Sequence, residues 1–207
     1  MRIELKGIGK RFNRDWIFKE ISANFKSEET IGLIGSNGSG KSTLLKIISA
    51  AELPTAGSLM YYSEQEAKLD LNEIHRNLSF AAPYMELPQQ LNPVELFKFH
   101  KNFKSFQNKL QVDLFLELIG LSNATNKLIG NFSSGMKQRL KLGLAICCES
   151  DVLLLDEPCS NLDSEGVSIY HKLMDDYANS RIVVIGSNEQ EEELYRTSKT
   201  INVLDYK

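Results

Sequence analysis

Residues 35–43, G-S-N-G-S-G-K-S-T, contain the pattern G-x-x-x-x-G-K-[ST] and decide what the surrounding chain must form. The glycines allow backbone N–H groups to turn around phosphate oxygens, and the helix expected to follow adds the positive end of its dipole. Lys41 is the expected partner of the β- and γ-phosphates, and the Ser42 hydroxyl is the expected magnesium ligand. The predicted nucleotide site comprises Gly35, Ser36, Asn37, Gly38, Ser39, Gly40, Lys41, Ser42 and Thr43.

The segments on either side of this loop supply the strand and the helix that it requires. Residues 30–34, T-I-G-L-I, are a short apolar run typical of a buried strand. After the loop, apolar residues recur at helical spacing, at Leu44, Leu45, Ile47, Ile48 and Ala51. Pro54 and Gly57 in the turn L-P-T-A-G-S then end the helix. This context disfavours the alternative, a glycine-rich turn with a solvated lysine.

Further along the chain, strand and helix patterns predict the fold class. Two apolar runs, Val152–Leu155 and Ile182–Ile185, have the length and branching of parallel strands buried on both faces. Residues 200–207, T-I-N-V-L-D-Y-K, read as one last strand, whereas the pattern from Asn92 to about Ser150 is mostly helical. We therefore predict one domain, with an α/β core over residues 1–84 and 150–207 and an inserted helical subdomain over residues 85–149.

An acidic pair follows the first of these apolar runs. Residues 152–158, V-L-L-L-D-E-P, deliver two carboxylates to the C-terminal end of a strand, the edge at which parallel sheets bind ligands. Asp156 can organise magnesium through its water shell. Glu157 points the other way and can orient or deprotonate an attacking water. The alternative is that the two acids are merely exposed at a strand end. The phosphate loop with Lys41 elsewhere in the chain disfavours it.

Residues 132–139, F-S-S-G-M-K-Q-R, read as the start of a helix. Ser133 is the expected N-cap, and Gly135 permits the close approach of another group. A helix N-terminus with such amides can bind an anion, although most Ser-Ser-Gly starts are only caps.

The order of these motifs resembles an ABC-type ATPase cassette along essentially the whole chain. The phosphate loop is followed by F-S-S-G-M, then by L-L-L-D-E-P, and then by S-N-L-D at residues 160–163. F-S-S-G-M resembles the signature L-S-G-G-Q, with Ser134 and Met136 as departures, and S-N-L-D resembles the D-loop, with Asp163.

This resemblance implies a P-loop NTPase (RecA-like) core with an inserted helical subdomain and an N-terminal antiparallel β portion. It implies ATP and Mg²⁺ as cofactors. Two cassettes, as a homodimer or a paired cassette, would pack head to tail around two ATP molecules. Each ATP would lie between the phosphate loop of one copy and Ser133, Ser134, Gly135 and Asp163 of the other. A separate transmembrane permease chain would be the membrane partner, contacted near Tyr84–Leu91 and holding the cassette on the inner face of the membrane.

Two positions of the family pattern are matched here by their place in the chain. The aromatic residue that stacks on adenine matches Phe12 best, 23 residues before Gly35, with Trp16 second; packing of Phe12 in the N-terminal sheet is the alternative. The glutamine between core and helical subdomain falls at Pro83 or Tyr84, and Gln89 and Gln90 lie too far downstream.

The switch histidine of the family is also replaced. Where relatives commonly carry A-T-H-D, this chain has G-S-N-E, which places Asn188 in the histidine position. An asparagine amide can donate a hydrogen bond to a γ-phosphate, but it does not take up a proton near neutral pH. We therefore expect ATP binding and dimer closure to persist and hydrolysis to be slower, or to depend more heavily on Glu157.

Composition narrows the function classes. The net charge of −3 disfavours nucleic-acid binding, and no apolar run reaches the length of a membrane span. Cys147, Cys148 and Cys159 lack metal-ligand spacing, so adjacent Cys147 and Cys148 are expected in the core of a reduced, cytoplasmic protein.

The leading hypothesis is thus an ATP-hydrolysing transporter subunit. The alternatives are a soluble ABC-type clamp on DNA or ribosomes, and a degenerate regulatory cassette with little hydrolysis. An ordinary P-loop kinase or GTPase is disfavoured because neither explains F-S-S-G-M ahead of the acidic strand.

Overall fold

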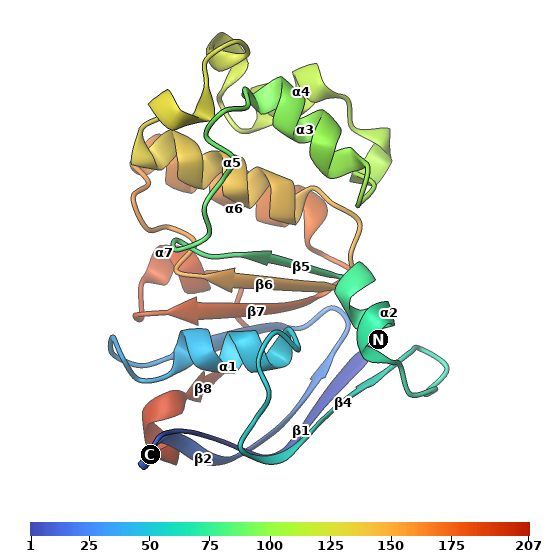
Figure 1. The fold of residues 1–207 in the computed structure, drawn as a ribbon, viewed down its shortest axis with the longest axis vertical. Coiled ribbons are helices and arrows are strands. Elements are labelled where there is room, and N and C mark those ends of the chain that lie inside the picture. Colours follow the sequence, from blue (N-terminus) through green and yellow to red (C-terminus); the bar gives the residue numbers. More distant parts are fainter. The chain divides into compact units, whose positions relative to one another are not determined.

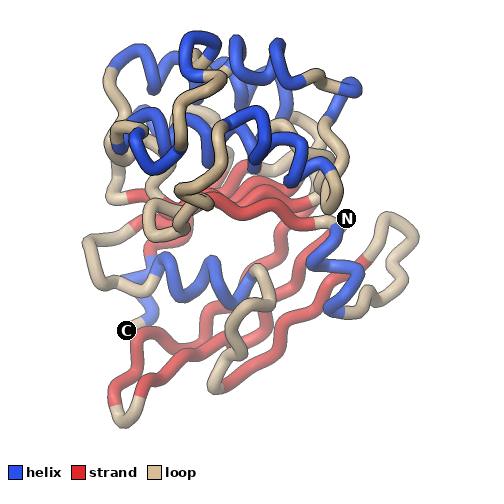
Figure 2. The backbone as a smooth tube through the Cα atoms, turned by 45° about the horizontal axis from the view of Figure 1, so that its top comes forward, coloured by secondary structure: helices blue, strands red, loops and turns tan.

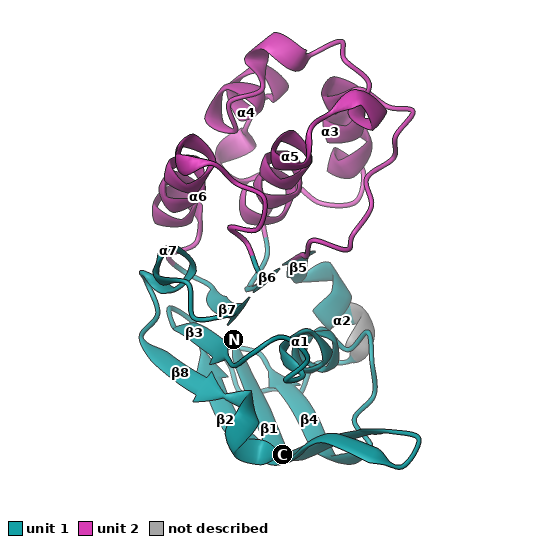
Figure 3. Cartoon of the chain, turned by 90° about the vertical axis from the view of Figure 1, so that its left-hand side faces the viewer, with its two compact units in different colours: residues 1–80, 150–157, 180–207 teal, residues 81–149, 158–179 magenta. Residues whose placement is uncertain are grey.

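Two sheets form the framework of the first of two units in the computed structural model, which describes residues 1–70 and 73–207. This unit contains residues 1–80, 150–157 and 180–207 (Figure 3). Its larger sheet has the strand order β5-β6-β7-β3-β8, and its smaller sheet has the order β2-β1-β4 (Figure 1). The larger sheet consists of β3 (Thr30–Ile34), β5 (Leu78–Ala81), β6 (Val152–Asp156), β7 (Ile182–Ser187) and β8 (Lys199–Asn202).

The smaller sheet lies at the N-terminal end of the chain and is antiparallel, as the resemblance implies. It consists of β1 (Arg2–Phe12), β2 (Asp15–Lys26) and β4 (Ala56–Tyr62). Its inward-facing side chains Ile3, Ile8, Phe18 and Phe25 share one apolar core with Leu44 and other residues of helix α1 (Lys41–Ile48). The smaller sheet therefore supports the helix that begins at the phosphate loop.

The central strands confirm the predicted parallel arrangement. β7 pairs in parallel with both β6 and β3, and every residue of β6 and β7 is buried. Continuous apolar runs suit strands covered on both faces. Since parallel strands end at one edge, the residues that follow β3, β6 and β7 meet there.

Two boundaries differ from prediction, and local polar contacts explain one of them. The prediction of one strand over residues 200–207 is wrong, because β8 ends at Asn202 and a 3₁₀ turn, Val203–Tyr206, follows. The Asn202 side chain accepts a hydrogen bond from the Leu204 N–H at 3.1 Å, while Val203 enters the core. Ala51 was expected on the apolar helix face, but α1 ends at Ile48 and Ala51 is exposed beyond the left-handed Ala50 (φ 59°).

The remaining helices of the first unit are short. They are α2 (Leu71–Arg76) and α7 (Glu191–Leu194). Figure 2 shows that strands are concentrated in this unit, whereas helices and loops make up the other. Within the described residues, no helix combines the length and apolar character needed to cross a membrane.

The second unit, residues 81–149 and 158–179, is helical. Its helices are α3 (Pro93–Lys101), α4 (Val112–Leu118), α5 (Ser134–Ile146) and α6 (Ser164–Tyr177). Asn92 and Glu95 form a reciprocal capping box at the start of α3, which satisfies two backbone N–H groups. Cys147 and Cys148 are fully buried, which confirms the expectation of core residues.

A glycine contact between β1 and β4 provides a stability test. A Cβ atom on Gly57 (φ +82°) would lie 2.2 Å from the Gly7 carbonyl oxygen and 2.4 Å from that of Lys6. Backbone atoms cannot move away without loss of strand pairing, so we expect Gly57→Ala to lower the free energy of unfolding by about 3 kcal/mol or more. Gly7→Ala is the control, since its φ of +58° is also left-handed but nothing lies within 4 Å. It should cost only about 1 kcal/mol. Urea unfolding measures both, and equal losses would contradict the steric explanation.

Candidate active site

The phosphate loop joins β3 to α1, as the motif predicts. Gly35, Gly38 and Gly40 have positive φ angles, and Gly40 lies directly before the helix at φ 111°. A Cβ atom on Gly40 would approach the Ile17 side chain of β2 to 2.6 Å, so only glycine fits beneath that strand. Ser36, Asn37 and Gly38 are exposed, and the loop borders a hollow also lined by Ile17 and Glu157. The loop thus presents its backbone to a ligand.

Lys41 lies at the centre of this loop with only 4% of its surface exposed. Its Nζ donates hydrogen bonds to the carbonyl oxygens of Gly35 at 2.7 Å and Ser36 at 3.1 Å. A third goes to Asn188 Oδ1 at 2.5 Å. Burial lowers the pKa of Lys41, and the nearby carboxylates of Glu157 and Asp156 oppose that shift.

Asn188 connects the loop with the acidic pair. Its Nδ2 donates to Glu157 Oε1 at 3.0 Å and to Asn37 Oδ1 at 2.7 Å. Strand register explains this meeting, because Ser187 of β7 pairs with Ile34 of β3 and Gly186 pairs with Asp156 of β6. The residues that follow β7, β3 and β6 are Asn188, Gly35 and Glu157, so these three lie at the same sheet edge. The predicted neighbours Lys41, Glu157 and Asn188 are brought together.

Asp156 and Ser42, the two predicted magnesium ligands, contact each other. The Ser42 hydroxyl hydrogen-bonds the carboxylate of Asp156, which is 2% exposed. Burial raises the pKa of Asp156, opposed by the Ser42 hydrogen bond and by Lys41. Asp156 Oδ1 is buried without a hydrogen-bond partner among residues 1–70 and 73–207. Such an oxygen beside a hydroxyl fits a hard cation that keeps water and phosphate ligands.

Glu157 has an unusual backbone. Its φ is +43°, which is a strained value for a residue with a side chain, and its N–H donates to the Gly186 carbonyl at 2.8 Å. Its half-buried carboxylate accepts a hydrogen bond from Asn188, whereas the buried carboxylate of Asp156 contacts Ser42. The two acids thus have different partners, as their predicted separate roles require.

The remaining motif residues belong to the second unit. Ser133 is the N-cap of α5, as predicted: its Oγ accepts from the Met136 N–H at 3.2 Å. Ser134 and Gly135 form the first turn, and a Cβ on Gly135 would lie 3.0 Å from the Asn161 carbonyl oxygen. Asp163 caps α6 by accepting from the Gly166 N–H at 2.8 Å. A nucleotide role for these four residues stays a prediction.

The two candidate aromatic residues differ in their surroundings. Phe12 ends β1 and is 47% exposed, so it is not a core residue of the N-terminal sheet, and the Lys10 ammonium lies 4.9 Å from its ring centre. Trp16 packs against Gly9, with Arg11 and Lys19 at 5.5 and 5.4 Å from its ring. Phe12 is the more exposed of the two, since Trp16 is 36% exposed.

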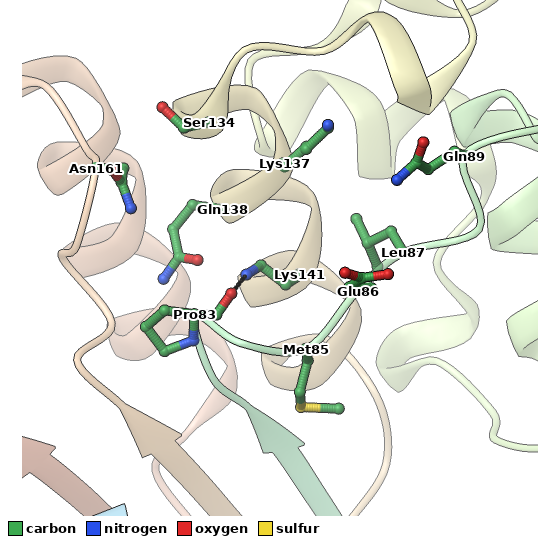
Figure 4. Close-up of a pocket in the computed structure, with 10 residues that line it drawn as sticks. All are labelled: Pro83, Met85, Glu86, Leu87, Gln89, Ser134, Lys137, Gln138, Lys141 and Asn161. Atoms are coloured by element: carbon green, nitrogen blue, oxygen red, sulfur yellow. Dashed lines mark hydrogen bonds between the residues drawn. The ribbon is translucent and has the colours of Figure 1, made fainter.

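Sequence reasoning missed Lys141, which lines a hollow of about 220 Å³ in the second unit (Figure 4). Lys141 Nζ donates to the Ala82 and Pro83 carbonyls at 3.1 and 2.9 Å, and burial lowers its pKa. Gln138 in the same hollow donates to the Pro158 carbonyl at 2.9 Å. A lysine among apolar helix residues gives no signal of such a contact.

The chain is similar to ATP-binding proteins of ABC transporters in sequence and to an ATP-binding cassette in fold. The family model described as ABC transporter matches residues 18–160. The Bacillus subtilis "Uncharacterized ABC transporter ATP-binding protein YybJ" is 30% identical over 197 residues, covering 92% of this chain and 87% of the relative. The Bacillus licheniformis "Bacitracin transport ATP-binding protein BcrA" is 28% identical over 183 residues, covering 88% and 60%. A solved dimeric ATP-binding cassette with ADP and Pi superposes with a TM-score of 0.79 at 22% identity, covering 98% and 95%.

Asp156→Asn tests the magnesium site. The neutral amide removes a buried charge, so without metal we expect unchanged or slightly higher stability, by about 1 kcal/mol. Thermal unfolding should show a large upward shift with ATP and Mg²⁺ in the wild type. That shift should fall to the metal-free ATP level in Asp156→Asn. Asp151→Asn, an exposed acid just before β6, is the matched control. Equal Mg²⁺-dependent shifts in wild type and Asp156→Asn would rule out the assignment.

Proposed function

The chain belongs to the ABC transporter ATP-binding family, and on this premise we propose that it binds and hydrolyses ATP to power a membrane transporter through nucleotide-driven dimerisation. The observation that carries the proposal is the meeting of Lys41, Asn188 and Glu157 beside the phosphate loop. A phosphate-binding cation, a neutral amide and a carboxylate then face one position, where a terminal phosphate and its attacking water would lie.

Nucleotide binding would rearrange the contacts of Lys41. Its ammonium now donates to Asn188 Oδ1 as well as to two loop carbonyls, so a phosphate oxygen must replace at least one of these acceptors. Loop N–H groups and the start of α1 would hold the other phosphate oxygens. The exposed ring of Phe12 would stack on the adenine.

Ser42 and Asp156 would hold Mg²⁺, which when bound neutralises charge on the β- and γ-phosphates. The unpartnered Oδ1 of Asp156 supports this role. Glu157 would orient the attacking water and accept its proton. Its hydrogen bond to Asn188, which also contacts Asn37 of the phosphate loop, supports this role.

Asn188 would act as a neutral γ-phosphate contact. Because an amide does not accept a proton near neutral pH, hydrolysis would be slower than with an imidazole and would depend mainly on Glu157. This same replacement supports the second candidate function, a regulatory cassette that binds ATP with little hydrolysis.

The active unit would be a head-to-tail pair of cassettes. Ser133, Ser134, Gly135 and Asp163 of one copy would complete the ATP site of the other. The Ser133 hydroxyl, which accepts from Met136, still has its proton to donate to a phosphate oxygen. The fold likeness to a solved dimeric cassette supports such a pairing, as a homodimer or with a second cassette.

The membrane partner would be a separate permease chain. Its cytoplasmic segment would contact residues 84–91, at the start of the helical subdomain proposed for residues 85–149. Met85, Glu86, Leu87 and Gln89 of this stretch line the hollow of Figure 4. The cassette would therefore lie on the inner face of the cell membrane.

Glu157→Gln tests the assignment of the base. We expect ATP binding to persist, a stable ATP-bound dimer to form on gel filtration, and turnover to fall by about 100-fold or more. Glu189→Gln is the control, because this exposed acid follows Asn188 directly. Full activity of Glu157→Gln would contradict its role. Negligible turnover of the wild type itself would favour the regulatory cassette.

Asn188→His tests the switch position. An imidazole can exchange a proton near pH 6.5, so we expect turnover to rise several-fold and to become pH-dependent between about pH 6 and 8. Asn188→Ala, which removes all three hydrogen bonds of the amide, should lower turnover. The measurement is steady-state phosphate release across pH. Unchanged turnover in both variants would exclude a γ-phosphate role for Asn188.

A further inference from the structure

Helix α3 and the turn after it differ in charge from the rest of the chain. Between Glu95 and Asp113 there are four lysines and no acidic residue, although the whole chain carries a net charge of −3. The lysines alternate with phenylalanines in F-K-F-H-K-N-F-K over residues 97–104. A basic segment with interspersed aromatic residues is therefore concentrated in one short stretch of the second unit.

Two of these phenylalanines are turned outward. Phe99 is 52% exposed and Phe103 is 73% exposed, and their ring centres lie 5.1 Å apart at an interplanar angle of 63°. Lys98 and Lys101, on either side of Phe99, are also exposed. We refer to Lys98, Phe99, Lys101 and Phe103 as the α3 face.

Buried rings fix the position of this face. Phe97, on the inner side of α3, stacks on Phe106 at 4.2 Å between ring centres and contacts Phe115 of α4 at 5.0 Å. The capping box of Asn92 and Glu95 fixes the start of the helix. The ring of Phe99 is therefore carried by a well-packed helix, and Phe103 follows in the turn directly after it.

We propose that the α3 face binds the headgroup layer of an anionic lipid membrane. Exposed phenyl rings can enter the boundary between headgroups and acyl chains, while flanking ammonium groups contact lipid phosphates. Charge favours this occupant over an apolar protein groove, because such a groove would have to desolvate Lys98 and Lys101. On the neighbouring helix α4, the acidic residues Asp113 and Glu117 lie near exposed Leu114. Because these charges are negative, the basic surface is confined to α3.

The place of α3 in the chain suits such a contact. Residues 84–91, proposed to meet the permease, lead directly into Asn92 and α3. A lipid contact would be a second attachment that needs no permease, so it can fail or succeed independently of the proposed transport function.

Vesicle flotation of the full chain, without permease, tests the proposal. Vesicles of phosphatidylcholine alone are compared with vesicles containing roughly one third phosphatidylglycerol. Binding should be at least about tenfold stronger to the anionic vesicles and should fall at high salt, because exposed charges are screened. Equal binding to both vesicles, or binding to neither, would overturn the proposal.

Paired variants locate the contact. Lys98→Gln with Lys101→Gln should weaken binding by about twenty-five-fold, at about fivefold per lysine. Phe99→Ser with Phe103→Ser should weaken it by about tenfold or more. Lys127→Gln with Leu128→Ser is the control, since these neighbours are an exposed basic and apolar pair elsewhere in the same unit.

Circular dichroism and ATP binding verify that each variant is folded. Anionic-vesicle binding by either α3 pair at wild-type strength would refute the assignment. A different outcome is that neither the wild type nor any variant binds vesicles, while purified permease binds the wild type but not the variant with Phe99→Ser and Phe103→Ser. In that case the face is a protein contact and the lipid proposal is wrong.

Discussion

A buried ammonium group is the constraint on which this structure depends. Lys41 is almost inaccessible, and a charge removed from water is tolerated only where strong acceptors surround it. Two of its acceptors are carbonyls of its own loop, and the third is a side chain 147 residues later in the sequence. The lysine therefore requires β7 to end beside β3. That strand order also places Asp156 and Glu157, at the end of β6, at the same sheet edge.

Asn188 satisfies this constraint in a way that an ionisable side chain would not. Its carbonyl oxygen faces a cation while its amide nitrogen faces a carboxylate and a second amide. An amide offers acceptor and donors at once and keeps them at any pH. An imidazole would lose its acceptor on protonation and would then repel Lys41. We propose that the asparagine preserves the order of the resting site, in place of a group that could exchange a proton during turnover.

Sequence reasoning succeeded where local chemistry decides the structure. The loop glycines, the apolar runs of β6 and β7, and the Ser133 cap are each determined by residues within one turn or one strand. It failed where a partner far away in the sequence, or the backbone angle of a single residue, determines where a side chain lies. Lys141 is defined by carbonyls about 58 residues away. Asn202 ended a strand by capping the following turn, and a left-handed Ala50 turned Ala51 out of the core.

Two groups at the sheet edge where a nucleotide would bind are left unsatisfied or strained. Asp156 Oδ1 lacks a partner among the described residues, and Glu157 holds a left-handed backbone. In the second unit, by contrast, Ser133 and Asp163 already satisfy the helix starts that they cap. A ligand and a cation would therefore find unsatisfied groups at the edge of the first unit, whereas the capped helix starts would offer only the hydroxyl and amide protons that their caps leave available.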